Sequence, residues 1–478
     1  MKLIYTSKPS YNQSVILLIK KGQNLDDLTF TTTEKDYVKK QIKSKVKQIH
    51  LNLLNRWVFI QLVDDKKKGD HLNEWLRIEG SKLQKRINAE KLKDITLIDK
   101  TNSKEWTLSL AEGIVLSNYQ FLKYKKEKKD LKHTLDKIQV FSKSLKKSDL
   151  DELWNVIEGV FFARDLINEP LSSLSAVQLS KEFRKFGSAA GFNVEVFNKQ
   201  KIESMKMGGL LAVNKGSIDP PTFSILEWKP DRAINKKPLI LVGKGVVYDT
   251  GGLSLKPTKD SMDYMKSDMS GAATVAGTLY AVAKSNLPIH VIGLIPATDN
   301  RPDGNAYVPG DIVKMGNGLS VEVLNTDAEG RMILAEALNY AKNYTPELVI
   351  DIATLTGSAS IAIGIYGIVG MGNASKNILN ALKASGEKVS ERIVEFPFWE
   401  EFDKLLESDV ADLKNVGGRD AGAITAGKFL EHFTDYPFIH LDIAGPAFVK
   451  NENNYKGKGG TGYTVRLLYD FIKNYPRK

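Results

Sequence analysis

Asn325-Thr326-Asp327-Ala328-Glu329-Gly330-Arg331 lies between an apolar run at Val321–Leu324 and the segment Met332–Tyr344, whose apolar residues recur with helical spacing. This order predicts a strand, a charged loop and a helix. The same alternation runs through the C-terminal two-thirds of the chain. It predicts strands at Asn193–Phe197, Phe223–Trp228, Leu239–Val242, His290–Ile295 and Leu348–Ala353, with helices at Ala176–Phe186 and Met269–Lys284. Several of these strands are continuous apolar runs, which is typical of a sheet covered by helices on both faces. The sequence therefore predicts an α/β fold.

Charge and glycine divide the chain into two parts. Residues 1–150 hold 32 lysines and arginines against 18 acids, whereas the remainder holds 36 against 39 and carries 33 of the 37 glycines. Helical spacing near Asp149–Ile167 predicts a helix between the parts. We therefore expect a smaller, basic N-terminal α/β domain at 1–148, a linker helix at 149–169, and a larger catalytic domain at 170–478 with a mixed sheet covered by helices. The N-terminal part alternates lysine-rich stretches with short apolar runs at Ser14–Ile19, Arg56–Val63, Ile95–Ile98 and Gly113–Leu116.

Composition excludes several classes of protein. The chain has no cysteine, so disulfides and thiolate metal sites are excluded. No apolar run approaches the roughly 20 residues of a membrane span. The early run Val15–Ile19 is closed by two lysines and is too short for the core of a signal peptide. These features predict a cytoplasmic protein.

Four segments at or near predicted strand ends gather charged residues among glycines. They are Gly243–Pro257, Met262–Met269, Asn325–Arg331 and Asp351–Ser358. Sites in open α/β sheets form at the carboxyl ends of strands. If the third segment stays extended, Asp327, Glu329 and Arg331 project to one side. Such carboxylates repel one another unless they are neutralised, and divalent cations with oxygen ligands would neutralise them.

Each acid taken alone has a simpler interpretation. Asp268 is placed to cap the predicted helix that follows it, and Asp327 to accept hydrogen bonds in a turn. Four acids (Asp249, Asp268, Asp327 and Glu329) together with Lys244, Lys256 and Arg331 favour a metal site. Patterns for other chemistries are absent, because the chain has no His-Glu-x-x-His and no Gly-x-Ser-x-Gly.

The segment Asn325–Arg331 resembles the signature of the leucine aminopeptidase (cytosol aminopeptidase) family. Other stretches agree with this resemblance over roughly residues 164–465, whereas the first 150 residues carry no such motif. The stretches are Arg164–Pro170, Gly243–Gly252, Ser254–Pro257, Asp351–Gly357, Ala421–Ala426, His440–Gly445 and Gly460–Tyr463.

The resemblance implies a role for ten residues. Lys244, Asp249, Asp268 and Glu329 match the ligands of one metal ion, and Asp249, Asp327 and Glu329 match those of a second. Lys256 and Arg331 match the two catalytic residues. Met265, Thr354 and Gly357 match positions that line the pocket for the substrate side chain.

The resemblance also implies an activity. It predicts a metal-dependent aminopeptidase that removes N-terminal, leucine-like residues from peptides by means of a water activated by two metal ions. The ions would be zinc or manganese, with magnesium or cobalt also compatible, and bicarbonate would bind at Arg331. The family further implies a homohexamer.

Two alternatives stay open. The chain is one residue longer than the family pattern around Lys259–Ser261, so Asp260 and Asp263 are rivals of Asp268, although the Met-Lys-x-Asp-Met context favours Asp268. The basic runs Lys123–Lys132 and Lys143–Lys147 are typical of solvated helix faces. As a rival function, the basic N-terminal domain would bind nucleic acid, with peptidase activity secondary.

Overall fold

The computed structural model describes residues 1–23, 30–64 and 66–475. The chain forms two compact units. The first contains residues 1–157 and 452–457, and the second contains residues 158–451 and 458–478. The division falls inside one continuous helix, α5 (Lys147–Asn168). The predicted boundaries at 148 and 169 therefore stay a prediction.

The first unit is built on a six-stranded sheet with the order β1-β6-β5-β2-β4-β3. All neighbouring strands are parallel except β3 and β4. The central strand β2 is buried along its whole length, which explains its unbroken apolar sequence. The elements are β1 (Lys2–Tyr5), β2 (Val15–Ile19), α1 (Thr32–Lys43), β3 (Gln48–Asn52), β4 (Trp57–Leu62), α2 (Gly69–Ala89), β5 (Asp94–Asp99), α3 (Lys104–Ser117), α4 (Lys128–Leu131) and β6 (Lys137–Phe141).

The second unit holds a mixed sheet with the order β16-β15-β18-β14-β9-β11-β8-β7. Strand β10 pairs with the residues of β11 that follow those paired with β9. The central strands β18, β14, β9 and β11 are mutually parallel, so their carboxyl ends meet at one edge. The strands of this sheet are β7 (Asn193–Phe197), β8 (Thr222–Trp228), β9 (Leu239–Gly243), β10 (Gly245–Asp249), β11 (Val291–Asn300), β14 (Leu348–Ala353), β15 (Ile368–Gly372), β16 (Ile393–Glu395) and β18 (Phe438–Asp442).

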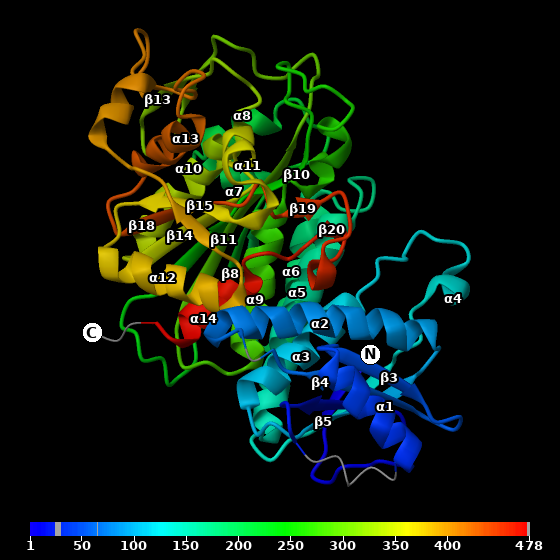
Figure 1. The fold of residues 1–478 in the computed structure, drawn as a ribbon. Helices are drawn as coiled ribbons and strands as arrows, with labels where there is room; N and C mark the ends of the chain where they lie inside the picture. The colour runs from blue at the N-terminus through cyan, green and yellow to red at the C-terminus, as the bar shows by residue number, and fades with distance from the viewer. Residues whose placement is uncertain (24–29, 65, 476–478) are drawn as a thin grey trace. The chain divides into compact units, whose positions relative to one another are not determined.

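Helices cover both faces of this sheet, as predicted (Figure 1). Helix α9 (Ser270–Lys284) packs on β9, β11 and β14 and is buried nearly all round, because its small and apolar residues contact further helices on its outer side. Its neighbours in that layer are α6 (Ala176–Ala190), α12 (Lys376–Val389) and α14 (Val465–Lys473). The opposite layer contains α8 (Gly208–Asn214), α10 (Glu329–Ala341) and α13 (Gly422–Glu431).

The remaining elements are short. They are α7 (Lys199–Ser204), η1 (Met262–Ser267), β12 (Ile312–Lys314), β13 (Ser320–Glu322), η2 (Lys342–Tyr344), α11 (Gly357–Ile363), η3 (Gly364–Tyr366), η4 (Glu400–Leu406), β17 (Leu413–Lys414), β19 (Phe448–Val449), η5 (Asn454–Lys456) and β20 (Gly459–Gly460). No helix within the described residues combines the length and apolar character needed to cross a bilayer.

The structure corrects several local expectations. The apolar run Gly113–Leu116, for which no element type was predicted, belongs to helix α3. The run Lys123–Lys132 is helical only at Lys128–Leu131, and it is exposed as expected. The strand predicted at Val321–Leu324 is β13, which belongs to a separate three-stranded sheet with β12 and β17. The glycine-rich segment after β9 was expected as a loop, but it begins with strand β10.

Candidate metal centre

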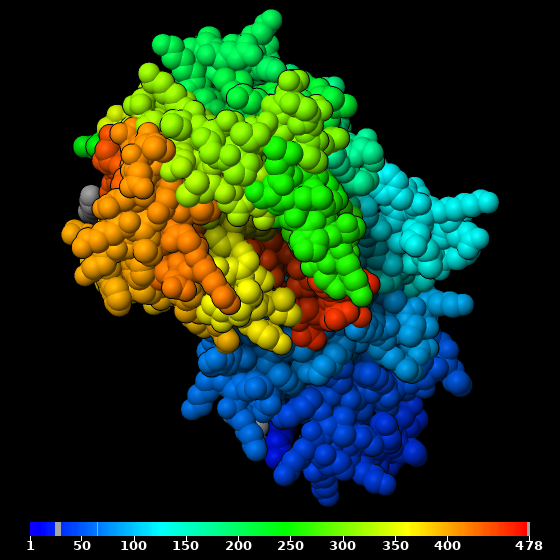
Figure 2. Space-filling view, turned by 90° about the horizontal axis from the view of Figure 1, so that it is seen from above, coloured from blue at the N-terminus to red at the C-terminus, as the bar shows by residue number. Residues whose placement is uncertain are grey.

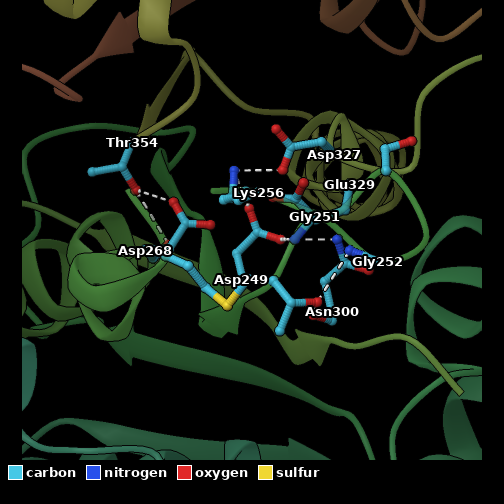
Figure 3. Close-up of polar contacts among 12 residues, drawn as sticks. Asp249, Gly251, Gly252, Lys256, Asp268, Asn300, Asp327, Glu329 and Thr354 are labelled. Carbon is cyan, nitrogen blue, oxygen red and sulfur yellow. Dashed lines mark hydrogen bonds and ion pairs between the residues drawn. The ribbon is translucent and has the colours of Figure 1, made fainter. Parts of the chain in front are cut away.

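The site lies where the carboxyl ends of the central strands meet the starts of two helices. Lys244 directly follows β9, and Asp249 is the last residue of β10. Asp268 stands between η1 and α9, and Glu329 is the first residue of α10. The side chains of Asp249, Asp268 and Glu329 converge from three separate segments of the chain (Figure 3).

Two lysines hold the carboxylates together. Lys244 Nζ lies 2.8 Å from Asp268 Oδ2 and 2.9 Å from Glu329 Oε1, and it donates to the carbonyl oxygen of Thr354 at 2.9 Å. Lys256 Nζ lies 2.8 Å from Asp249 Oδ2 and also pairs with Asp327 (Figure 3). Each ammonium therefore bridges two acids that come from different segments.

Space for Lys244 depends on a glycine. A Cβ at Gly330 would lie 2.5 Å from Lys244 Cε and 2.7 Å from its Nζ. Any side chain at this position would displace the lysine from Asp268 and Glu329. The glycine inside the motif Asn325–Arg331 is thus explained by the close approach of a charged side chain to the first turn of α10.

The carboxylates outnumber the lysines. Asp249, Asp268 and Glu329 each offer an oxygen within 4.8 Å of the others and are only 2%, 4% and 1% exposed. Burial raises the pKa of Glu329, and the charge of Asp249 raises it further. Burial, followed by Asp249 and Glu329, raises the pKa of Asp327 to about 7. The lysines thus leave part of the negative charge uncompensated.

This donor set fits divalent cations. Glu329 Oε2 is buried and has no hydrogen-bond partner among the described residues. A buried carboxylate oxygen without a partner is costly, and a cation would satisfy it. Oxygen donors from several carboxylates suit magnesium, manganese and zinc, and the absence of thiolates disfavours soft metals. Asp249, Asp268, Asp327 and Glu329 are therefore suited to hold ions at this position.

Arg331 reaches the site differently from the prediction. The expectation that Asp327, Glu329 and Arg331 share one side of an extended segment is wrong, because α10 begins at Glu329. Residues two apart in a helix point in nearly opposite directions. Arg331 is instead buried and donates from Nη1 to the carbonyl oxygen of Asn415 at 2.7 Å. Its Nε has no hydrogen-bond partner among the described residues.

A cavity of about 460 Å³ opens over the centre. Figure 2 shows a hollow bordered by the green, yellow and orange parts of the chain. All ten residues singled out from the sequence line this cavity: Lys244, Asp249, Lys256, Met265, Asp268, Asp327, Glu329, Arg331, Thr354 and Gly357. Of the two rivals of Asp268, Asp260 lies at the cavity but pairs with Lys450 at 2.8 Å, and Asp263 is not part of the lining.

Sequence reasoning missed the residues whose hydrogen bonds hold the site residues and their segments in place. Asn300, the last residue of β11, donates to Asp249 Oδ1 at 2.9 Å. Asp442 accepts from Thr356 Oγ1 at 2.7 Å and from the backbone N–H of Leu355, so it fixes the segment after β14. The available signal was a polar residue ending a long apolar strand. That signal indicates where a strand ends but does not indicate which side chain the polar residue binds.

A mixed α/β sheet with buried carboxylates and lysines at its strand ends defines the chain as a metallohydrolase. The model for the catalytic domain of the cytosol aminopeptidase family matches residues 161–469. The chain belongs to the cytosol aminopeptidase family, and it is a metal-dependent aminopeptidase of that type.

Similar proteins agree with this assignment. The chain is 45% identical to a probable cytosol aminopeptidase of Chlorobium phaeobacteroides, over 77% of this chain and 75% of the relative. It is 42% identical to a probable cytosol aminopeptidase of Geobacter sulfurreducens, over 76% and 74% of the two chains. Among solved structures, the bottromycin maturation enzyme BotP in complex with Mn matches with a TM-score of 0.85 and 27% identity, covering 97% of this chain and 99% of that one.

Proposed function

We propose that the chain removes single residues from the amino ends of peptides with two divalent ions bound in this centre. Asp249, Asp268 and Glu329 would hold one ion together with Lys244, whose amine would lose its proton because the adjacent cations lower its pKa, and Asp249, Asp327 and Glu329 would hold the other. The observation that carries this proposal is the surplus of buried carboxylates over lysines. Zinc or manganese suits the donors best, and magnesium or cobalt is compatible. The manganese complex of BotP supports this choice.

The ions would supply an activated water and polarise the carbonyl of the scissile bond. The protein's own side chains would stabilise the developing negative charge and take part in proton transfer. Burial acts to lower the pKa of Lys256, but Asp249, Glu329 and Asp327 raise it overall, which favours a protonated Nζ before ions bind. A protonated Lys256 at the cavity wall would stabilise the negative charge that develops on the carbonyl oxygen.

Arg331 would hold an anion that moves the proton. Its guanidinium lines the cavity, and its Nε has no hydrogen-bond partner among the described residues. A planar guanidinium suits an anion that accepts two hydrogen bonds, and bicarbonate has that shape. Bicarbonate at Arg331 would act as general base. No histidine takes that role in the cavity, because His290, His432 and His440 pair with Glu227, Asp403 and Asp351 elsewhere.

The preferred substrate side chain would be leucine-like. Met265, Thr354 and Gly357 would form its pocket, and all three line the cavity. A Cβ added at Gly357 would meet no atom within 4 Å, so this wall of the pocket is open. An unbranched methionine adapts to apolar side chains of varied shape. This combination favours a medium-sized apolar residue at the substrate's amino end.

The remaining expectations concern assembly and location. A cytoplasmic homohexamer acting on peptides is supported by the family resemblance and by relatives named cytosol aminopeptidases. Light scattering would measure the assembly directly. The rival function, nucleic-acid binding by the basic N-terminal part, predicts a salt-dependent shift in DNA mobility.

Hydrolysis of leucine p-nitroanilide tests the proposal. The assay needs protein with added manganese or zinc, protein with a chelator, and a substrate whose amino group is blocked. We expect activity that requires the free amine, disappears on chelation and returns with metal. Equal activity on the blocked substrate would contradict an exopeptidase that recognises the amino end.

A further inference from the structure

Asp249 occupies a central place in the cluster, and its carboxylate is oriented by groups outside the cavity. Oδ2 faces Lys256 at 2.8 Å inside the site. Oδ1 faces away and accepts from the backbone N–H of Gly251 at 2.8 Å and from Asn300 Nδ2 at 2.9 Å (Figure 3). The direction of Oδ2 therefore depends on what holds Oδ1.

Strand pairing brings Asn300 to this position. Asp249 and Asn300 are register partners at the ends of the parallel strands β10 and β11, and the register shifts between Val246 and Asp249. Such an irregularity redirects a side chain next to a site. The carbonyl oxygen of Asn300 also accepts from the backbone N–H of Thr250 at 3.0 Å. Both the backbone and the side chain of Asn300 thus fix the end of β10.

The same amide reaches the second carboxylate-bearing segment. Asn300 Nδ2 also donates to the carbonyl oxygen of Thr326 at 3.0 Å, next to Asp327. That carbonyl accepts a further bond from Tyr307 Oη at 2.9 Å. Since both acceptors of Nδ2 are oxygens, only the amide nitrogen fits between them, and this settles the orientation of the amide.

The carbonyl oxygen of the Asn300 side chain makes an unfavourable contribution to stability. Its Oδ1 is buried and has no hydrogen-bond partner among the described residues. A Cβ at Gly252 would lie 2.9 Å from this oxygen, and Gly252 has a φ of +62°, so the backbone is shaped to accommodate the amide. A buried polar atom without a partner destabilises the fold. The two N–H donors of the amide, which bind Asp249 and the carbonyl oxygen of Thr326, offset this cost.

A neutral amide also suits the electrostatics. A lysine or arginine in its place would add positive charge that opposes the binding of cations. An aspartate would turn oxygens towards Asp249 Oδ1 and the carbonyl of Thr326, which are both acceptors. Asparagine supplies two donors without a net charge. Groups that orient metal ligands in this way commonly change metal affinity or activity by 10–100-fold when removed.

We propose that Asn300 is a positioning residue of the metal centre, which directs Asp249 Oδ2 into the cluster and ties the end of β10 to the Thr326–Asp327 segment. The inference rests on the proposed metal-binding role of Asp249. It assigns to Asn300 no contact with the substrate. The binding of Mn²⁺ alone, in the absence of peptide, is therefore the property that Asn300 controls.

Asn300→Leu removes both donors at similar volume and adds no acceptor. Asn214→Leu is a matched control, because Asn214 is also buried and donates twice from Nδ2, to the carbonyl oxygen of Asp219 at 2.8 Å and to Thr298 Oγ1 at 3.0 Å. Neither partner lines the cavity. Asn300→Ala serves as a second variant if the leucine does not fold.

Titration calorimetry of the metal-free full-length proteins with Mn²⁺ tests the inference. We expect Asn300→Leu to weaken Mn²⁺ binding about 10–100-fold. Asn214→Leu should bind Mn²⁺ like the wild type, and at saturating Mn²⁺ the KM of Asn300→Leu should change less than its kcat. Wild-type affinity in Asn300→Leu, or equal loss in Asn214→Leu, would overturn the inference. A wild type that binds no Mn²⁺ would instead overturn the proposed metal centre.

Discussion

Gly330→Ala is the substitution whose effect follows most directly from the structure. The added methyl would sit 2.5 Å from Lys244 Cε and 2.7 Å from Nζ, inside the separation that real Cβ atoms keep. Lys244 must then move, because Gly330 lies in the first turn of α10 and its backbone is fixed. The movement would break the contacts of Nζ with Asp268 and Glu329, which are 2.8 and 2.9 Å long.

The two consequences have different magnitudes. Overpacking costs about 1–3 kcal/mol of stability, while alanine in place of a helical glycine returns about 1 kcal/mol, so packing alone costs about 0–2 kcal/mol, and the broken contacts of Lys244 with two buried carboxylates add to this loss. Displacement of a site group by about 1 Å costs on the order of 100-fold in rate. We therefore expect a variant that folds with lowered thermal stability and loses at least about 100-fold in kcat/KM for leucine p-nitroanilide.

A glycine-to-alanine change elsewhere serves as the control. A methyl at Gly304 meets no atom within 4 Å, so Gly304→Ala should keep full activity. Thermal unfolding and steady-state kinetics on the same preparations separate the two effects. A Gly330→Ala enzyme with wild-type kcat/KM would refute the argument that the observed place of Lys244 is needed for catalysis.

Three further predictions concern other parts of the site and its support. Lys256→Met should lower kcat about 100–1,000-fold while metal content by elemental analysis stays unchanged; loss of metal would show a structural role instead. Gly357→Val should narrow the open pocket wall and lower kcat/KM for leucine substrates about 10-fold or more relative to alanine substrates, and an unchanged ratio would place the pocket elsewhere. Burial raises the pKa of Glu336, in helix α10, from its ordinary 4.5 to about 7. As the pH rises, Glu336 therefore ionises in the unfolded chain before it ionises in the folded protein. The free energy of unfolding falls by up to about 3 kcal/mol between these two pKa values. Glu336→Gln removes this loss, so its urea-unfolding free energy relative to wild type should rise from pH 5 to pH 8; a constant difference would contradict the shift.

The sequence predicted best where one local rule governs structure. Strands β7 and β14 have the predicted ends, because continuous or alternating apolar runs between turn residues are read locally. The site residues meet in one cavity, because parallel strands place their carboxyl ends at one edge. These inferences needed no knowledge of which strands are neighbours.

Other features depend on partners distant in sequence. The run Gly113–Leu116 is too short to separate a strand from a buried helix, and packing against α2 decides for helix. Strand β10 forms because β11 offers it an edge, although its glycines and charges are typical of a loop. Glu329 is helical rather than extended, since α10 starts three residues earlier than its apolar spacing indicates. Asn300 was missed because its role depends on Asp249 and Thr326, which approach it only in the folded chain.

The number of metal ions bound to each protein chain tests the central claim most directly. Elemental analysis and calorimetry of the metal-free protein titrated with Mn²⁺ would give this number for the wild type and for Glu329→Ala, which lacks the proposed bridging carboxylate. The account predicts two ions per wild-type chain, with loss of tight binding and of leucine p-nitroanilide hydrolysis in the variant. A Glu329→Ala protein that still binds two ions and keeps its activity would contradict it.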